Sequence, residues 1–225
     1  MSIYSQIIAN REFFMLAHTL IIGLICFIIV LKTDKLFRLS LHQGIRYFRN
    51  AFFFFGLAFI SRYLLGTTPI TPSVLKIVFE FFLLMAGFSL LYSLLWKRLE
   101  KKRTSISSLF NIKIGIFYLI ALIIVTLDFL WGTYNFMFAS QIIVFTYASI
   151  ISAIKYKQSK TKKGFLKFYF LVMVLNLAAW IMNLIIATTF QWNRIGVINI
   201  YLLNLIIFIV FFYGVILATQ KNKKS

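Results

Sequence analysis

Residues that could bind a ligand or move a proton are scarce in this sequence, and one of them lies inside an apolar stretch. The 225 residues include only five acidic residues, two histidines and one cysteine. Glu80 lies nine residues beyond Thr71, within a stretch of largely apolar residues. An ionisable group in such a stretch is costly and usually has a partner, so it marks a candidate functional site. The sequence offers two partners for this carboxylate, Arg62 on the preceding apolar stretch and Lys76 four residues before it.

Further polar side chains lie at a comparable depth on other apolar stretches, when depth is counted at a helical rise of about 1.5 Å per residue. Asn176, Trp180 and Asn183 follow the i, i+4, i+7 spacing of a single helix face. Small polar ligands are bound by a few convergent polar groups in an otherwise apolar wall. We therefore expect an outward-facing polar pocket that combines a cation, two carboxylates, amides and rings: Arg62, Glu80, Asp128, Asn176, Trp180, Asn183, Tyr201, Asn204, Gln141 and His18.

The same residues also fit a purely structural role. Arg62 would then pair with Glu80 and tie two neighbouring helices, and Asp128 would cap the end of its own helix. The amide side chains would hydrogen-bond between helices. Because an ion pair in a membrane serves either role, the sequence leaves the choice between a pocket and a structural network open.

No motif for catalysis, a cofactor or a metal is present. The chain lacks the H-E-x-x-H, G-x-S-x-G and glycine-rich phosphate-binding patterns. His18 and Cys26 lie eight residues apart on one stretch, too far for both to bind the same ion. We therefore expect a protein that is not an enzyme and has neither a cofactor nor a metal site.

The elements that must position these residues are membrane-spanning helices. Hydrophobic residues make up 61% of the chain and charged residues 13%, which predicts an all-α polytopic integral membrane protein with a single domain over 1–225 and no soluble domain. The basic connection at 32–49 predicts a helix lying in the membrane interface. Seven apolar stretches are long enough to span a bilayer, at about 13–31, 47–65, 74–96, 112–131, 134–154, 168–188 and 195–219.

The basic residues orient these spans. Alternate connections and the C-terminal tail hold five, six, six and three of the 24 Lys and Arg residues. The positive-inside rule therefore places the N-terminus outside and the C-terminus in the cytoplasm, in a cytoplasmic membrane. This placement explains the net charge of +19 without nucleic acid, and it predicts contact with the lipid bilayer and with anionic lipids at the basic loops. Trp96, Trp131 and Trp192 lie near span ends and are expected to anchor the protein at the two interfaces.

Seven spans with an external N-terminus resemble the layout of rhodopsins, SWEET-type sugar transporters and seven-helix sensor modules, a similarity of shape alone. The last span has no lysine for a retinal Schiff base, and no span contains the prolines of a SWEET-type hinge. We expect a receptor or sensor that binds a small ligand from outside. Because the chain stops at Ser225, its output would need a separate cytoplasmic signalling partner. A small-solute or proton-coupled transporter with Glu80 as its titrating group, and an accessory membrane subunit, are the alternatives.

Overall fold

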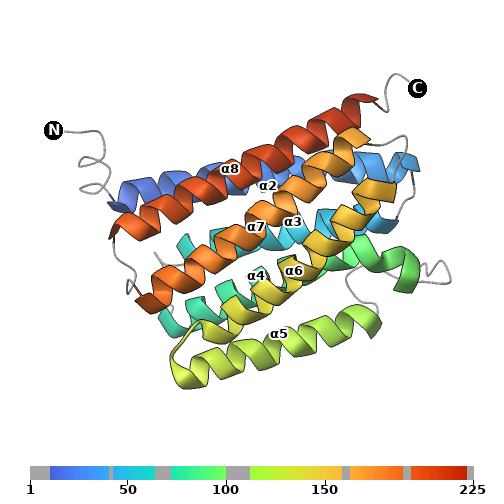
Figure 1. Cartoon of the computed structure of the whole chain (residues 1–225). Coiled ribbons are helices and arrows are strands. Elements are labelled where there is room, and N and C mark those ends of the chain that lie inside the picture. Colours follow the sequence, from blue (N-terminus) through green and yellow to red (C-terminus); the bar gives the residue numbers. More distant parts are fainter. Residues whose placement is uncertain are drawn as a thin grey trace.

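The computed structural model describes residues 11–40, 43–63, 72–99, 112–158, 163–189 and 194–221. The described residues form seven α-helices and no β-strand, which confirms the predicted all-helical polytopic membrane fold. Each predicted span overlaps one of these helices, which run roughly parallel and antiparallel to one another (Figure 1). The helices are α2 (Arg11–Ser40), α3 (Gln43–Tyr63), α4 (Pro72–Leu99), α5 (Ile112–Trp131), α6 (Asn135–Gln158), α7 (Lys163–Thr189) and α8 (Arg194–Lys221).

All of these helices except α3 are long and apolar enough to cross a membrane. α3 differs because its 21 residues include Arg46, Arg49 and Arg62. Most of its side chains are nevertheless buried against other helices, and polar residues are tolerated in a helix that faces the interior of a bundle. The six apolar spans are Leu16–Arg38, Ser73–Trp96, Ile114–Trp131, Asn135–Gln158, Leu166–Thr189 and Ile198–Leu217.

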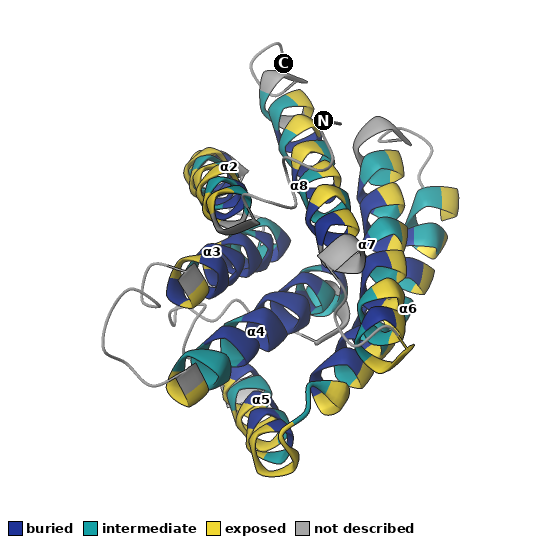
Figure 2. Cartoon of the chain, turned by 90° about the vertical axis from the view of Figure 1, so that its left-hand side faces the viewer, coloured by how far each residue is buried: buried dark blue, intermediate teal, exposed yellow. Residues whose placement is uncertain are grey.

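Six helices form a closed ring, and α5 lies outside it. Around the ring α2 contacts α3, α3 contacts α4, α4 contacts α6, α6 contacts α7, α7 contacts α8, and α8 returns to α2. α5 packs against α4 and α6 on the outer side of the ring, as the end-on view shows (Figure 2). Accordingly 56% of the apolar span of α4 is buried in the protein but only 22% of that of α5. The helices therefore follow one another around the ring in the order of the chain, except that α5 is left out.

The first connection differs from the prediction. Instead of a separate interfacial helix over 32–49, α2 continues to Ser40 and α3 begins at Gln43. Asp34 accounts for the difference, because its carboxylate accepts a hydrogen bond from Arg38 at 2.9 Å, one helical turn further on, and pairs with Arg49 of α3. These ion pairs compensate the charges of the segment while α2 stays helical, and they tie α2 to α3.

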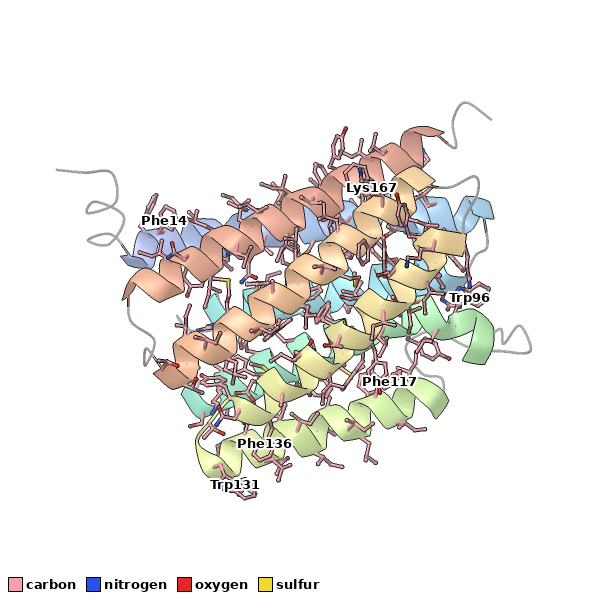
Figure 3. The ribbon with its side chains drawn as sticks, viewed as in Figure 1. Phe14, Trp96, Phe117, Trp131, Phe136 and Lys167 are labelled. Carbon is pink, nitrogen blue, oxygen red and sulfur yellow. The ribbon has the colours of Figure 1, made fainter. Side chains whose placement is uncertain are left out.

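The outer surface of the bundle suits lipid rather than water. Large apolar side chains such as Leu24, Leu119, Leu130 and Ile143 are each more than half exposed. Exposed apolar side chains in this number are typical of helices that contact a membrane. Trp96 and Trp131 lie at opposite ends of the bundle, where the two membrane interfaces are expected (Figure 3). Trp192 lies outside the described residues.

Candidate ligand-binding cavity

The bundle has two unlike ends. We call the end at which α2, α4, α6 and α8 begin the cavity end, and the opposite end the closed end. The cavity end lies on the left of Figure 1, together with the turn between α5 and α6. All ten residues predicted to form the pocket lie in the half of their helices nearer this end, or close to its boundary.

The turn between α5 and α6 is built around Asp128. Gly132 ends α5 with a φ of +63°, a left-handed conformation that glycine adopts without steric cost. The chain then reverses, and the fully buried carboxylate of Asp128 accepts hydrogen bonds from the backbone N–H of Met137 at 2.7 Å and of Phe136 at 3.1 Å. It also accepts one from the hydroxyl of Thr133 at 3.0 Å. Asp128 thus caps the start of α6. The structural alternative predicts instead that it caps the end of α5, the helix to which it belongs.

Glu80 pairs with Lys76. The side chain of Glu80 is fully buried, and its Oε1 lies 3.8 Å from Nζ of Lys76. The same ammonium group donates a 2.7 Å hydrogen bond to the carbonyl oxygen of Thr133 and lies 4.2 Å from the ring centroid of Tyr134. Lys76, one of the two candidates that the sequence offers, is therefore within ion-pair distance of Glu80, and it also fastens α4 to the turn before α6.

Arg62 occupies a different position at the same end. Its guanidinium lies over the ring of Phe79, 4.6 Å from the centroid, which joins the end of α3 to the first turns of α4. The side chain of Arg62 is exposed. A cation over an aromatic face is attracted by the negative potential of the ring.

A cavity of about 310 Å³ lies between five helices of the ring. α3, α4, α6, α7 and α8 all contribute to its wall, and α2 does not. Its volume falls at the lower end of the range for small-molecule sites. Six of the ten predicted residues line it: Arg62, Asn176, Trp180, Asn183, Tyr201 and Asn204.

The amides in this wall bond within their own helix. Nδ2 of Asn176 donates to the carbonyl oxygen of Val172, and Nδ2 of Asn183 donates to that of Ala179, both at 2.9 Å. The structural alternative predicts that these amides bond between helices. In the structure both amides bond within α7 instead. Each bond fixes the rotamer of its amide while the residue remains part of the cavity wall.

The other four predicted residues lie outside the wall. Glu80 and Asp128 are engaged as described above. His18 of α2 packs against the back of the wall, where its ring centroid lies 4.8 Å from that of Tyr201 and 5.9 Å from that of Phe59. Gln141 is a contact between α6 and α4, because its fully buried Nε2 donates to the carbonyl oxygen of Leu83 at 3.3 Å.

Close packing of α4 and α6 at Gln141 depends on Gly87. A Cβ atom at Gly87 would clash with the Oε1 atom of Gln141. Glycine thus leaves the space that the buried amide fills, as small residues do where membrane helices approach closely. The sequence contains both residues but gives no sign that they meet.

Sequence reasoning missed most of the apolar wall. The missed lining residues are largely aromatic, and Tyr134, in the turn before α6, is the one with a polar group. Aromatic residues are so frequent in this chain, at 19%, that composition does not separate those of the wall from those facing lipid. A seven-residue spacing could have found some of them, since Phe55 and Phe208 lie two helical turns from Arg62 and Tyr201 respectively.

Comparison with known proteins adds no relative. No family model matches the sequence, and no curated protein or solved structure matches the chain.

Proposed function

We propose that this protein is a non-enzymatic membrane receptor or sensor that binds a small ligand in the cavity between α3, α4, α6, α7 and α8. The observation that supports this proposal is the cavity itself, where three Asn side chains and Arg62 stand in an otherwise largely apolar and aromatic wall. Ligand sites combine an apolar enclosure with a few placed polar groups in this way. With the N-terminus outside, as the basic loops predict, the cavity end faces the exterior of a cytoplasmic membrane.

A bound ligand would act on the closed end through the helices that surround it. α3, α7 and α8 each extend from the cavity wall to the closed end, so a shift of one helix at the wall is carried along its length. A packed bundle moves between discrete arrangements instead of deforming continuously. In this proposal the basic loops at the closed end contact anionic lipids and pass the shift to a separate signalling partner in the cytoplasm.

The test uses two neighbouring alanines of α7. Ala179 is buried and lines the cavity, whereas Ala178 is exposed on the lipid face. Wild type, Ala179→Leu and Ala178→Leu would be purified in detergent and their melting temperatures measured against a panel of small metabolites. We expect at least one compound to raise the melting temperature of wild type and of Ala178→Leu, but not that of Ala179→Leu, because the added side chain fills the cavity. A compound that stabilises all three proteins equally, or a panel without any shift, would contradict the proposal.

Proton-coupled transport of a small solute is the second candidate, and Glu80 favours it. Both of its carboxylate oxygens are buried, and within the described residues neither accepts a hydrogen bond. An intramembrane carboxylate in this state is a group that could gain and lose a proton during transport. Flux into proteoliposomes under a pH gradient separates the two candidates. A transporter moves the stabilising compound and loses the pH dependence in Glu80→Gln, whereas a receptor binds it without flux.

A further inference from the structure

The polar side chains that α7 contributes to the cavity wall are regularly spaced. Asn176 and Asn183 lie seven residues apart, and Trp180 lies between them on the same face of the helix. All three side chains line the cavity, and Asn176 is only 7% exposed. Asn183 is the member nearer the cavity end, because α7 ends there. From the cavity end inward, α7 therefore offers an amide, an aromatic ring and a second amide.

The hydrogen bonds of the two amides show which atom of each is left for a ligand. Both Nδ2 atoms donate at 2.9 Å to a backbone carbonyl oxygen, an acceptor that requires the NH₂ group and not the oxygen of the amide at this position. Within the described residues neither Oδ1 accepts a hydrogen bond. The Oδ1 of Asn176 is not sealed off either, since the fully enclosed and unpartnered polar side-chain atoms of the described residues belong to His18, Glu80, Gln141 and Ser149. The two oxygens are therefore acceptors that α7 presents to the cavity.

The distance between these acceptors follows from the geometry of the helix. Asn176 and Asn183 make the same bond, each to the carbonyl oxygen four residues earlier, so their amides stand in the same orientation on α7. Seven residues at a rise of about 1.5 Å separate the two oxygens by about 10 Å along the helix axis. A hydrogen bond of about 2.9 Å at each end leaves about 5 Å between two donor atoms of a ligand. A benzene ring with donors on opposite carbon atoms has about this length.

The rest of the wall suits a flat ring. Half of the residues that line the cavity are aromatic. Trp180 packs against Phe138 with ring centroids 6.1 Å apart and planes at 49°, and Phe55 meets Phe208 at 5.4 Å and 86°. Such rings offer both faces and edges to a further aromatic ring. The volume of about 310 Å³, at the lower end of the range for ligand sites, suits a molecule with a single ring.

The charges at the cavity end balance one another. Two cations, Arg62 and Lys76, lie there with two carboxylates, Glu80 and Asp128, and the other three all act electrostatically on Glu80. No excess of one sign therefore selects an anion or a cation. An uncompensated charge is costly inside a bundle of membrane helices, so this balance favours a neutral ligand.

Building on the proposed receptor function, we propose that the ligand is a small neutral aromatic molecule with a hydrogen-bond donor at each of two opposite ends. One donor bonds to Oδ1 of Asn176 and the other to Oδ1 of Asn183, and the ring lies against Trp180 between them. The two fixed acceptors and their spacing carry this assignment. The tyrosine hydroxyls of the wall and the amide of Asn204 both donate and accept hydrogen bonds, so they do not discriminate against a donor.

The experiment compares three neutral single-ring probes of nearly equal size: hydroquinone, catechol and 4-fluorophenol. Hydroquinone has hydroxyl groups at opposite ends of the ring, catechol has them on neighbouring carbon atoms, and 4-fluorophenol has fluorine in place of one of them. Calorimetric titration of the full-length protein in lipid nanodiscs, without oxygen and with empty nanodiscs as the blank, would measure binding. We expect hydroquinone to bind at least about threefold more tightly than either other probe, because it alone donates to both acceptors at once. Equal binding of the three probes, or tighter binding of catechol or 4-fluorophenol, would overturn the assignment.

Variants of α7 localise the two acceptors. Asn176→Leu and Asn183→Leu each remove one acceptor with little change in volume, and each should abolish the preference for hydroquinone over 4-fluorophenol. Thr188→Val is the matched control, because this exposed threonine also bonds to the carbonyl oxygen four residues earlier on α7 but does not line the cavity, and it should keep the preference. Retention of the preference in either asparagine variant would overturn the assignment. If an asparagine variant does not fold, the wild-type probe series still decides whether both donors are needed.

The outcomes separate this inference from the proposed function. Binding of all three probes without a preference, abolished by Ala179→Leu, would keep a receptor cavity while overturning the ligand with two opposite donors. If no probe of the series binds, this ligand class is overturned, and the metabolite panel then decides separately whether the cavity binds anything at all.

Discussion

The same three helices, α3, α7 and α8, line a large cavity in one half of the bundle and a small void in the other. In the cavity half the space is about 310 Å³, whereas in the closed half the void between them is about 10 Å³. In the closed half Phe48 and Phe52 of α3 pack against Phe211 of α8 with centroid distances of 5.9 and 4.8 Å. Phe48 also meets Tyr169 of α7 at 5.8 Å.

The two halves differ in the side chains that these helices place between one another. In the closed half α7 and α8 contribute Tyr169 and Phe211, and the rings meet at the centre. In the cavity half the same helices contribute Asn176, Asn183 and Asn204, and two of these amides bond to their own backbone. Trp180, Tyr201 and Phe208 of the same two helices also line the cavity, so its wall mixes short amides with rings. The cavity half is held instead at its rim, by contacts such as the one from Lys76 to the turn before α6.

The largest effect is expected from shortening a ring in the closed half. Phe52 is fully buried, and Phe52→Ala should lower the free energy of unfolding by about 3–5 kcal/mol, since it opens a new cavity in a filled region. Phe55, one turn away on the same helix, already borders a cavity, so Phe55→Ala should cost clearly less. Equilibrium unfolding in mixed lipid and detergent micelles measures both. Equal costs would show that the two halves are packed alike.

Removing the cap of α6 should have the next largest effect. Asp128→Ala leaves the N–H groups of Phe136 and Met137 without their acceptor and should cost about 2 kcal/mol. Thr126→Ala is the control, because this threonine lies on the same helix with an exposed side chain bonded to Leu122, and it should cost no more than about 0.5 kcal/mol. The same unfolding assay applies. A result in which Asp128→Ala is as mild as the control would mean that the rim does not depend on the cap.

Adding a methyl group between α4 and α6 should destabilise by about 1–2 kcal/mol. Gly87→Ala pushes against the amide of Gln141, whose hydrogen bond to α4 limits how far it can move. Combining it with Gln141→Ala should recover part of the loss, a coupling that a double-mutant cycle measures. Gly115→Ala on α5 meets no neighbouring atom and should be neutral or slightly stabilising. If the effects of Gly87→Ala and Gln141→Ala on the free energy of unfolding simply add, the contact between these two residues is refuted.

The smallest effect is expected from filling the cavity. Ala179→Leu should change the free energy of unfolding by less than about 1 kcal/mol, because the cavity has room for the added atoms. Ala51→Leu in the closed half has no such room around a fully buried alanine and should cost about 1–3 kcal/mol. Thermal unfolding of the two variants beside wild type gives the difference. If Ala179→Leu proved the more damaging, the cavity wall would be less open than the comparison requires.

The spans were predictable from the sequence because bilayer thickness fixes their length and composition. The connection at 32–49 was not, since its basic residues fit an interfacial helix equally well until Asp34 is seen to pair with Arg49 across two helices. Depth along each helix could be counted, and six of the ten residues predicted at a comparable depth line one cavity.

Rotation about each helix axis was the missing information. Counting depth gives Gln141, His18 and Asn204 comparable positions, yet only Asn204 lines the cavity, because α6 turns Gln141 toward α4 and α2 stands behind the wall. Nor did the sequence show that α5 lies outside the ring, although its exposed surface follows from that position. Both facts depend on which helices meet, and one sequence does not contain this information.

The position of α5 outside the ring has a consequence for biosynthesis. Helices enter the bilayer in chain order, so α5 is inserted after α4 and before α6. α4 is therefore in the membrane before α6, its neighbour in the ring, arrives. During that interval the face of α4 that carries Gly87 has no partner from α6. The ion pair between Lys76 and Glu80 spans one turn of α4 itself, so it can form before any neighbour arrives. The chain thus carries a cation for the buried carboxylate of Glu80 into the membrane on the same helix.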